Sequence, residues 1–145
     1  MGDRDELINR RDEKIKQIEE FMENLESTFP IGYEEYINDF KIRAIWERYF
    51  EKIIEAVVDL ALIVIRYYEF EKPEDEESSF YILRDNDIIS DSLADRLRAA
   101  KGMRNIIAHE YGKVDDNLVY ESVNNELFED VNEFIEKIIV VRKFS

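Results

Sequence analysis

The chain has 145 residues with 20 Lys and Arg against 35 Asp and Glu, a formal net charge of −15, and 45% of its residues are hydrophobic. This length and apolar fraction are typical of one folded domain over residues 1–145 and exclude a disordered acidic tail over most of the chain. The charge disfavours sequence-nonspecific contact with duplex DNA, because phosphodiester backbones are repelled at long range.

The chain contains no cysteine, which excludes disulfides, thiolate nucleophiles and thiolate metal sites and favours a cytoplasmic location. Its N-terminal segment is densely charged where a signal peptide needs an apolar stretch, and its most apolar run, residues 60–65, is too short to span a bilayer. We therefore expect neither export nor membrane insertion.

Only 4 Gly and 2 Pro interrupt the chain, and the apolar residues between them recur at helical spacing. The first stretch predicts a helix over residues 3–28, ended by Pro30 and Gly32. The second predicts a central helix over residues 33–68, with a kink or short break around Asn38 and Asp39, where the apolar pattern weakens.

An acidic, exposed loop without assigned chemistry is expected from Glu69 to Ser79, followed by a short helix around residues 80–83. Ser90 or Asp91 is a suitable N-cap for the next helix, which is expected to end near Gly112 with a left-handed cap. The last helix begins at one of three capping candidates, Asp115, Asp116 and Asn117. The sequence thus predicts an all-α fold, an antiparallel bundle of about five helices.

The single histidine, His109, is the only side chain whose ordinary pKa allows proton transfer in both directions near neutrality. A lone histidine near a helix C-terminus is more often structural, so its neighbours decide the interpretation. Arg104 lies about 140° away from His109 around an ideal helix, whereas Asn105 shares its face. Either the helix unwinds near His109, or a two-fold dimer brings two arginines and two histidines into one cleft.

Such a cleft suits RNA cleavage. Arginine binds a phosphate through two charge-assisted hydrogen bonds, and histidine can take a proton from a 2′-hydroxyl or give one to a leaving 5′-oxygen. The sequence has no metal-ligand set of recognisable spacing, no glycine-rich phosphate loop and no serine-hydrolase elbow. The expected activity is therefore a metal-independent ribonuclease without a cofactor, whose local positive groove is formed by Arg98, Lys101, Arg104 and Lys113.

The segment Arg104-Asn105-Ile106-Ile107-Ala108-His109, completed by Tyr111, resembles the R-x4-H-x-Y motif of the HEPN superfamily, and more closely that of HepT toxins. The Ile-Ile-Ser segment before the motif helix and the run from His109 to Leu127 are similar to that family as well.

This resemblance implies a homodimeric, metal-independent endoribonuclease toxin with Arg104 and His109 of both subunits as catalytic residues and Asn105 as a supporting residue. It also implies a partner, an MNT-type nucleotidyltransferase antitoxin, which neutralises the toxin by AMPylation of Tyr111.

Two other functions fit the same residues. The chain could be a non-catalytic HEPN binding module that docks a minimal nucleotidyltransferase and a nucleotide, because not every HEPN protein is an active nuclease. A dimeric helical scaffold without either activity is the third interpretation.

Overall fold

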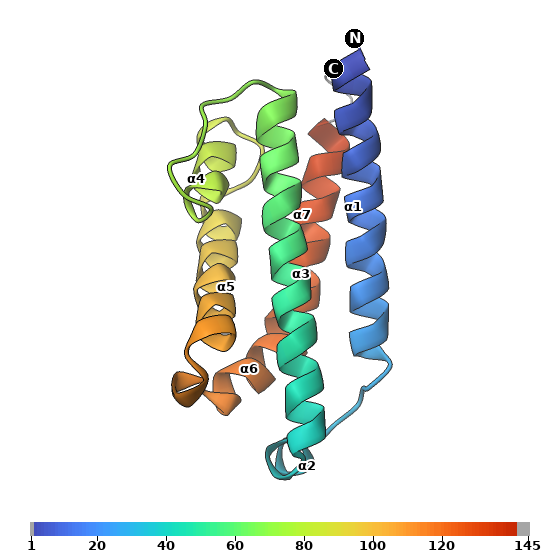
Figure 1. Cartoon of the computed structure of the whole chain (residues 1–145), viewed down its shortest axis with the longest axis vertical. Coiled ribbons are helices and arrows are strands. Elements are labelled where there is room, and N and C mark those ends of the chain that lie inside the picture. The colour runs from blue at the N-terminus through green and yellow to red at the C-terminus, as the bar shows by residue number, and fades with distance from the viewer. Residues whose placement is uncertain (1, 142–145) are drawn as a thin grey trace.

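The structure is a computed structural model that describes residues 2–141, and every regular element within this range is a helix (Figure 1). In chain order the elements are α1 (Gly2–Glu26), α2 (Tyr33–Asn38), α3 (Phe40–Tyr67), α4 (Ser78–Asp85), α5 (Asp91–His109), η1 (Tyr111–Lys113), α6 (Asp116–Ser122), η2 (Val123–Leu127) and α7 (Phe128–Val141). The predicted all-α fold is confirmed.

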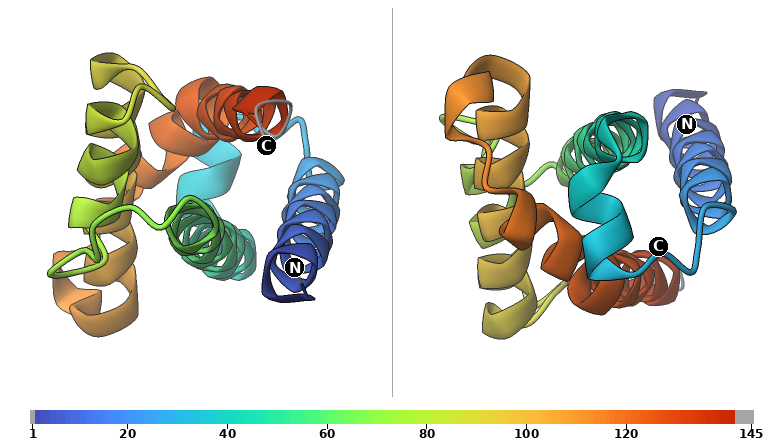
Figure 2. Two further views of the ribbon diagram at one scale, coloured as in Figure 1. Left: turned by 90° about the horizontal axis from the view of Figure 1, so that it is seen from above. Right: turned by 90° about the horizontal axis from the view of Figure 1, so that it is seen from below.

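The long helices α1, α3, α5 and α7 alternate in direction and form the antiparallel bundle (Figure 1). Seen along the bundle axis, α3 and α7 lie between α1 on one side and α4 with α5 on the other (Figure 2). Within residues 2–141, no helix combines the length and the apolar character needed to cross a membrane.

The central helix is interrupted where the sequence predicts a break. Asp39 has an extended backbone, with φ −117° and ψ 98°, and separates α2 from α3. Its carboxylate accepts hydrogen bonds from the backbone N–H groups of Lys41 at 3.0 Å and Ile42 at 3.2 Å. Asp39 therefore caps α3, and the helix that follows buries a wide apolar face because α1, α4 and α5 all pack against it.

A cluster of rings fills the bundle where α2, α3 and the C-terminal helices meet. The rings of Trp46 and Tyr120 are stacked with centroids 5.7 Å apart, and the Tyr36 ring lies 4.8 Å from that of Trp46. Trp46 donates its indole N–H to the Thr28 hydroxyl at 2.9 Å, which satisfies its polar atom. We call this cluster the aromatic base; its members are Phe29, Tyr36, Trp46, Tyr120 and Phe128.

The last helix differs from the regular α-helix that the sequence predicts, because a π-helical segment, η2, lies between α6 and α7. The buried residues Val119, Val123, Leu127 and Val131 are spaced by four. In a regular α-helix this spacing drifts by about 40° per step, and the wider π turn keeps all four on the core side.

The predicted loop ends slightly earlier than expected, since α4 begins at Ser78. The Asp75 carboxylate accepts hydrogen bonds from the Ser78 N–H at 2.8 Å and the Ser78 hydroxyl at 2.6 Å, and these bonds lower the pKa of Asp75. The end of this loop is also bound to α5, as described below.

Candidate functional site

The motif lies on the second half of α5. Ser90 caps this helix by accepting a hydrogen bond from the Leu93 N–H at 3.1 Å, and the helix buries one side of its first half in the core. Regular helix continues through His109, after which the Glu110 N–H bonds to the Ile106 carbonyl at 2.8 Å. The helix is thus regular from Arg104 to His109 and ends at His109, three residues before the end predicted near Gly112.

The predicted left-handed cap at Gly112 is wrong, because none of the glycines in the described residues has a positive φ. The chain instead leaves α5 through η1, in which the Lys113 N–H donates to the Glu110 carbonyl at 2.8 Å. A tight turn of this kind satisfies a terminal carbonyl without a left-handed residue.

Arg104 is directed against α3. Its Nη2 lies 3.2 Å from Oε2 of Glu55, and only 18% of the arginine side chain is exposed. The Nε atom is buried and makes no hydrogen bond. The guanidinium therefore retains an unused donor beside its ion pair, and an unsatisfied buried donor of this type costs about 1–3 kcal/mol.

Asn105 and Lys101 are bonded to each other one helical turn apart. The Lys101 Nζ donates to the Asn105 Oδ1 at 2.7 Å and lies 3.2 Å from Oε1 of Glu76. The Asn105 amide in turn donates to Glu77 at 3.5 Å. Lys101 is only 6% exposed, so these partners hold a buried ammonium group.

Lys101 and Arg104 line the same small cavity of about 80 Å³, between α3, α5 and the end of the acidic loop. We call it the motif cavity; its lining residues are Glu55, Val58, Asp59, Glu76, Lys101 and Arg104. Two cations and three carboxylates line this cavity, and Lys101 and Arg104 are each paired with one of the carboxylates.

His109 is exposed on the last turn of α5 and does not line the motif cavity. Within the described residues its imidazole makes no hydrogen bond or ion pair. One copy of the chain therefore does not bring Arg104 and His109 to a common point, in agreement with the 140° separation expected from their spacing.

The expected positive groove is neutralised in the structure. Each of its four cations pairs with a carboxylate, at N–O distances of 3.2 to 3.8 Å: Arg98 with Glu77, Lys101 with Glu76, Arg104 with Glu55, and Lys113 with Glu110. Only two of the four line the motif cavity. In a chain with 35 acidic and 20 basic residues, a cation readily finds a carboxylate within reach.

The acidic side chains around the motif were not among the expected site residues. Glu76 and Glu77 belong to a loop to which the sequence assigns no chemistry, and Glu55 is separated from Arg104 by 49 positions. Lys101 carried a detectable signal, because it continues the spacing of Leu93 and Leu97 on the buried side of α5.

Tyr111, the predicted modification site, is the first residue of η1. Its side chain lies outside the described residues, so only its backbone position is given. That position, two residues beyond His109, follows directly from the end of α5.

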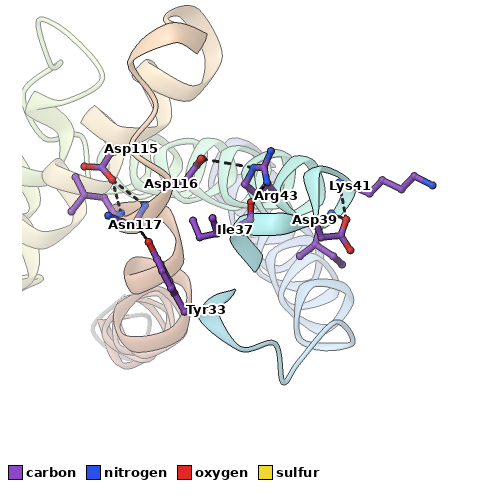
Figure 3. Close-up of polar contacts among 10 residues, drawn as sticks. Tyr33, Ile37, Asp39, Lys41, Arg43, Asp115, Asp116 and Asn117 are labelled. Atoms are coloured by element: carbon purple, nitrogen blue, oxygen red, sulfur yellow. Dashed lines mark hydrogen bonds and ion pairs between the residues drawn. The ribbon is translucent and has the colours of Figure 1, made fainter. Parts of the chain in front are cut away.

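The segment after η1 is fixed to the rest of the bundle (Figure 3). Asp115 caps α6 by accepting hydrogen bonds from the N–H groups of Asn117 at 3.0 Å and Leu118 at 3.2 Å, as one of the three capping candidates. Arg43 on α3 pairs with Asp116 at 3.8 Å and donates to the Ile37 carbonyl. The Tyr33 hydroxyl also donates to the Asn117 side chain, so α2 and α3 together anchor the start of α6.

Burial and the nearby Asp116 carboxylate raise the pKa of Glu47, and Arg43 opposes this shift. The like-charged pair destabilises this junction whenever both carboxylates are ionised. Within residues 2–141, no group of three or more His, Asp or Glu side chains is arranged to hold a metal ion.

The comparisons with known proteins agree on one family. A family model described as "Ribonuclease HepT-like" matches residues 14–138. An mRNA nuclease HepT of Shewanella oneidensis is 27% identical over 125 residues, which are 86% of this chain and 92% of that protein. A tRNA nuclease HepT of Aphanizomenon flos-aquae is 23% identical over 77% of this chain and 76% of that protein.

Among solved structures, a tri-AMPylated HEPN toxin of Shewanella oneidensis in complex with MNT antitoxin has a TM-score of 0.83 and 25% identity, covering 90% of this chain and 96% of that one. The similarity thus extends over nearly the whole bundle and confirms the resemblance drawn from the motif. The chain belongs to the HepT-like ribonuclease family.

Proposed function

We propose that this chain is a metal-independent RNase toxin of a HEPN/MNT toxin–antitoxin pair, active in the cytoplasm as a homodimer. The observation that carries the proposal is the regular helix from Arg104 to His109, which keeps the two side chains on different faces of α5. Both groups reach one phosphate only if a second copy packs against this helix and contributes the missing partner. The cleft of the proposed dimer would then hold two arginines and two histidines.

In the proposed reaction, the 2′-hydroxyl of RNA attacks the adjacent phosphorus. One His109 imidazole accepts the hydroxyl proton, the P–O5′ bond breaks, and an imidazolium in the same cleft protonates the leaving 5′-oxygen. The products are a 2′,3′-cyclic phosphate and a 5′-hydroxyl end, and no other reactant is needed. Arg104 binds the phosphate and stabilises the charge that develops on its oxygens.

In this proposal, the phosphate of the RNA replaces Glu55 as the partner of Arg104. The Glu55 carboxylate occupies the position of an anion beside the guanidinium, and its side chain is 58% exposed. An exposed carboxylate can turn into water when a phosphate replaces it, at little cost. Asn105, already bonded to Lys101, supports the orientation of the site.

The proposed partner is an MNT-type nucleotidyltransferase antitoxin that AMPylates Tyr111. Two solved relatives support neutralisation by AMPylation. One is a tri-AMPylated HEPN toxin with MNT antitoxin, and the other is a toxin–antitoxin with AMP-PNP. Nucleotide phosphates added two residues after His109 would compete for the arginine and repel an RNA backbone.

Incubation of the purified chain with RNA and a chelator tests the activity. We expect cleavage, and we expect His109→Ala to slow it by at least about 100-fold, the lower range for a lost general acid–base group. Asn132→Ala, at an exposed position of α7, is the matched control and retains full activity. Equal cleavage by the His109→Ala protein would refute the assigned roles, and a monomer in sedimentation experiments would refute the dimeric site.

A second candidate function is a non-catalytic module that docks a nucleotidyltransferase and a nucleotide. The complete pairing of the four motif cations with carboxylates favours it, since no unpaired positive surface remains there for RNA. This function predicts intact RNA together with a stable complex between the two proteins.

A further inference from the structure

Two arginines differ from all the others in residues 2–141. The side chain of every other described arginine has a hydrogen bond, an ion pair or a ring contact, whereas the side chains of Arg10 on α1 and Arg66 on α3 have none. In a chain with a net charge of −15, unpaired guanidinium groups are the exception. Both line the same groove between α1 and α3.

This α1–α3 groove has a volume of about 560 Å³. Its charged lining comprises Arg10, Lys14 and Arg66 against Glu13 and Asp59, so its formal charge is positive. Lys14 is already engaged, at 3.5 Å from Asp59 and 3.0 Å from the Gln17 side chain. The two arginines are therefore the groups free to bind an added anion.

The groove lies next to the motif cavity on α3. Asp59 lines both, and α3 carries Glu55, Asp59 and Arg66 along one side of the helix. Arg66 lies 11 residues beyond Glu55 on α3, a rise of about 16 Å along the helix axis. Because α3 lies between α1 and α5 (Figure 1), an extended strand that leaves the motif cavity and crosses α3 would reach the groove on the α1 side.

We propose that the α1–α3 groove is a binding site for the phosphate backbone of single-stranded RNA, holding the strand to one side of the bond cleaved at the motif. The inference rests on the proposed function and adds to it the path of the substrate. Guanidinium groups bind phosphates bidentately, and the rise of about 16 Å from Glu55 to Arg66 along α3 suits several nucleotides of one strand rather than a single small anion. The groove shares Asp59 with the motif cavity, and this position beside the proposed cleavage site favours RNA over an acidic protein segment as the occupant.

The double variant Arg10→Gln/Arg66→Gln tests the site. A fluorescent RNA carrying 2′-O-methyl groups at every position cannot be cleaved by 2′-hydroxyl attack and reports binding alone. We expect its Kd to rise about tenfold at roughly 100 mM salt. The slope of log K against log salt concentration should fall in magnitude by about 1.4, since each phosphate contact on a single strand contributes about 0.7.

A matched control removes two cations elsewhere. Lys41 and Lys137 are exposed, and neither lines the groove or the motif cavity, so Lys41→Gln/Lys137→Gln changes the net charge equally. We expect this control to leave the salt slope unchanged. Substrate length gives a second measurement: the groove variant should cleave a dinucleotide at the wild-type rate and raise KM only for long RNA.

The outcomes separate the two proposals. Wild-type Kd and salt slope in the Arg10→Gln/Arg66→Gln protein, with RNA still cleaved, would overturn the groove and leave the ribonuclease. Weakened RNA binding in a chain that never cleaves RNA would retain the groove and overturn the ribonuclease. Loss of the dimer, or loss of a nucleotidyltransferase complex with RNA binding intact, would assign the groove to a protein contact and overturn the proposal.

Discussion

The aromatic base and the motif cavity are stabilised in opposite ways. In the aromatic base, Trp46 and Tyr36 are completely buried, and the rings contact one another directly. In the motif cavity, Lys101 and Arg104 are paired with Glu76 and Glu55, whose side chains are more than half exposed. Packing therefore stabilises the base, whereas the motif cations are held by ion pairs with partly exposed carboxylates.

Removing the largest ring from the aromatic base should have the greatest effect on stability. Trp46→Ala leaves a cavity in the core and is expected to lower the free energy of unfolding by about 3–5 kcal/mol. Urea denaturation followed by circular dichroism measures the change. A decrease in the free energy of unfolding below about 1 kcal/mol would show that the aromatic base contributes little to stability.

Arg104→Gln should have the opposite effects, a large loss of activity and a small change in stability. We expect RNA cleavage to fall by about 100-fold, as when one donor to a transition-state oxyanion is removed, with an unfolding free energy within about 1 kcal/mol of wild type. The small stability effect follows from the exposed partner and the unsatisfied Nε. A cleavage assay and a urea titration on the same sample measure both, and a large loss of stability would contradict the comparison.

Glu55→Gln tests whether Glu55 competes with RNA for Arg104. Removing the competing carboxylate should raise RNA affinity by about threefold, the effect of a weak, partly exposed ion pair. Glu51→Gln, which removes the partner of Arg48 on the same helix, controls for the change in net charge. Equal gains in both variants would show that Glu55 acts only through the overall charge of the protein.

The smallest effect is expected beside the aromatic base, at Glu47. A carboxylate whose pKa is raised on folding stabilises the native state at low pH and loses this contribution as pH rises through the raised pKa. Glu47→Gln should therefore be more stable than wild type at pH 7, and the difference should disappear toward pH 4. Urea denaturation at both pH values tests this, and a gain that persists at pH 4 would exclude the carboxylate as its cause.

Local signals in the sequence predicted much of the fold. The break at Asp39 and the caps at Ser90 and Asp115 depend on side chains bonding to neighbouring N–H groups, so they can be predicted from short segments. The π-helical segment and the end of α5 depend on which tertiary contacts the chain can satisfy. Neither could be predicted from helical periodicity alone.

The candidate site also combines features that local sequence predicts with features that depend on tertiary packing. The separation of Arg104 and His109 around α5 follows from the helical repeat and was expected. The pairing of Arg104 with Glu55 required knowledge of how α3 and α5 pack, because many acidic residues were equally plausible partners in this composition. The unpaired state of Arg10 and Arg66 depends on the same long-range packing.

The π-helical segment η2 also marks a place where the length of the last helix can vary. Deleting one residue there, such as the exposed Asn125, would convert the π turn to regular α-helical winding with little change in the rotation of α7 relative to α6. Phe134 and Ile138 would therefore still face the core, whereas a deletion early in α7 would rotate the residues after it by about 100°. Single-residue deletions in relatives should therefore fall in this segment rather than in α7.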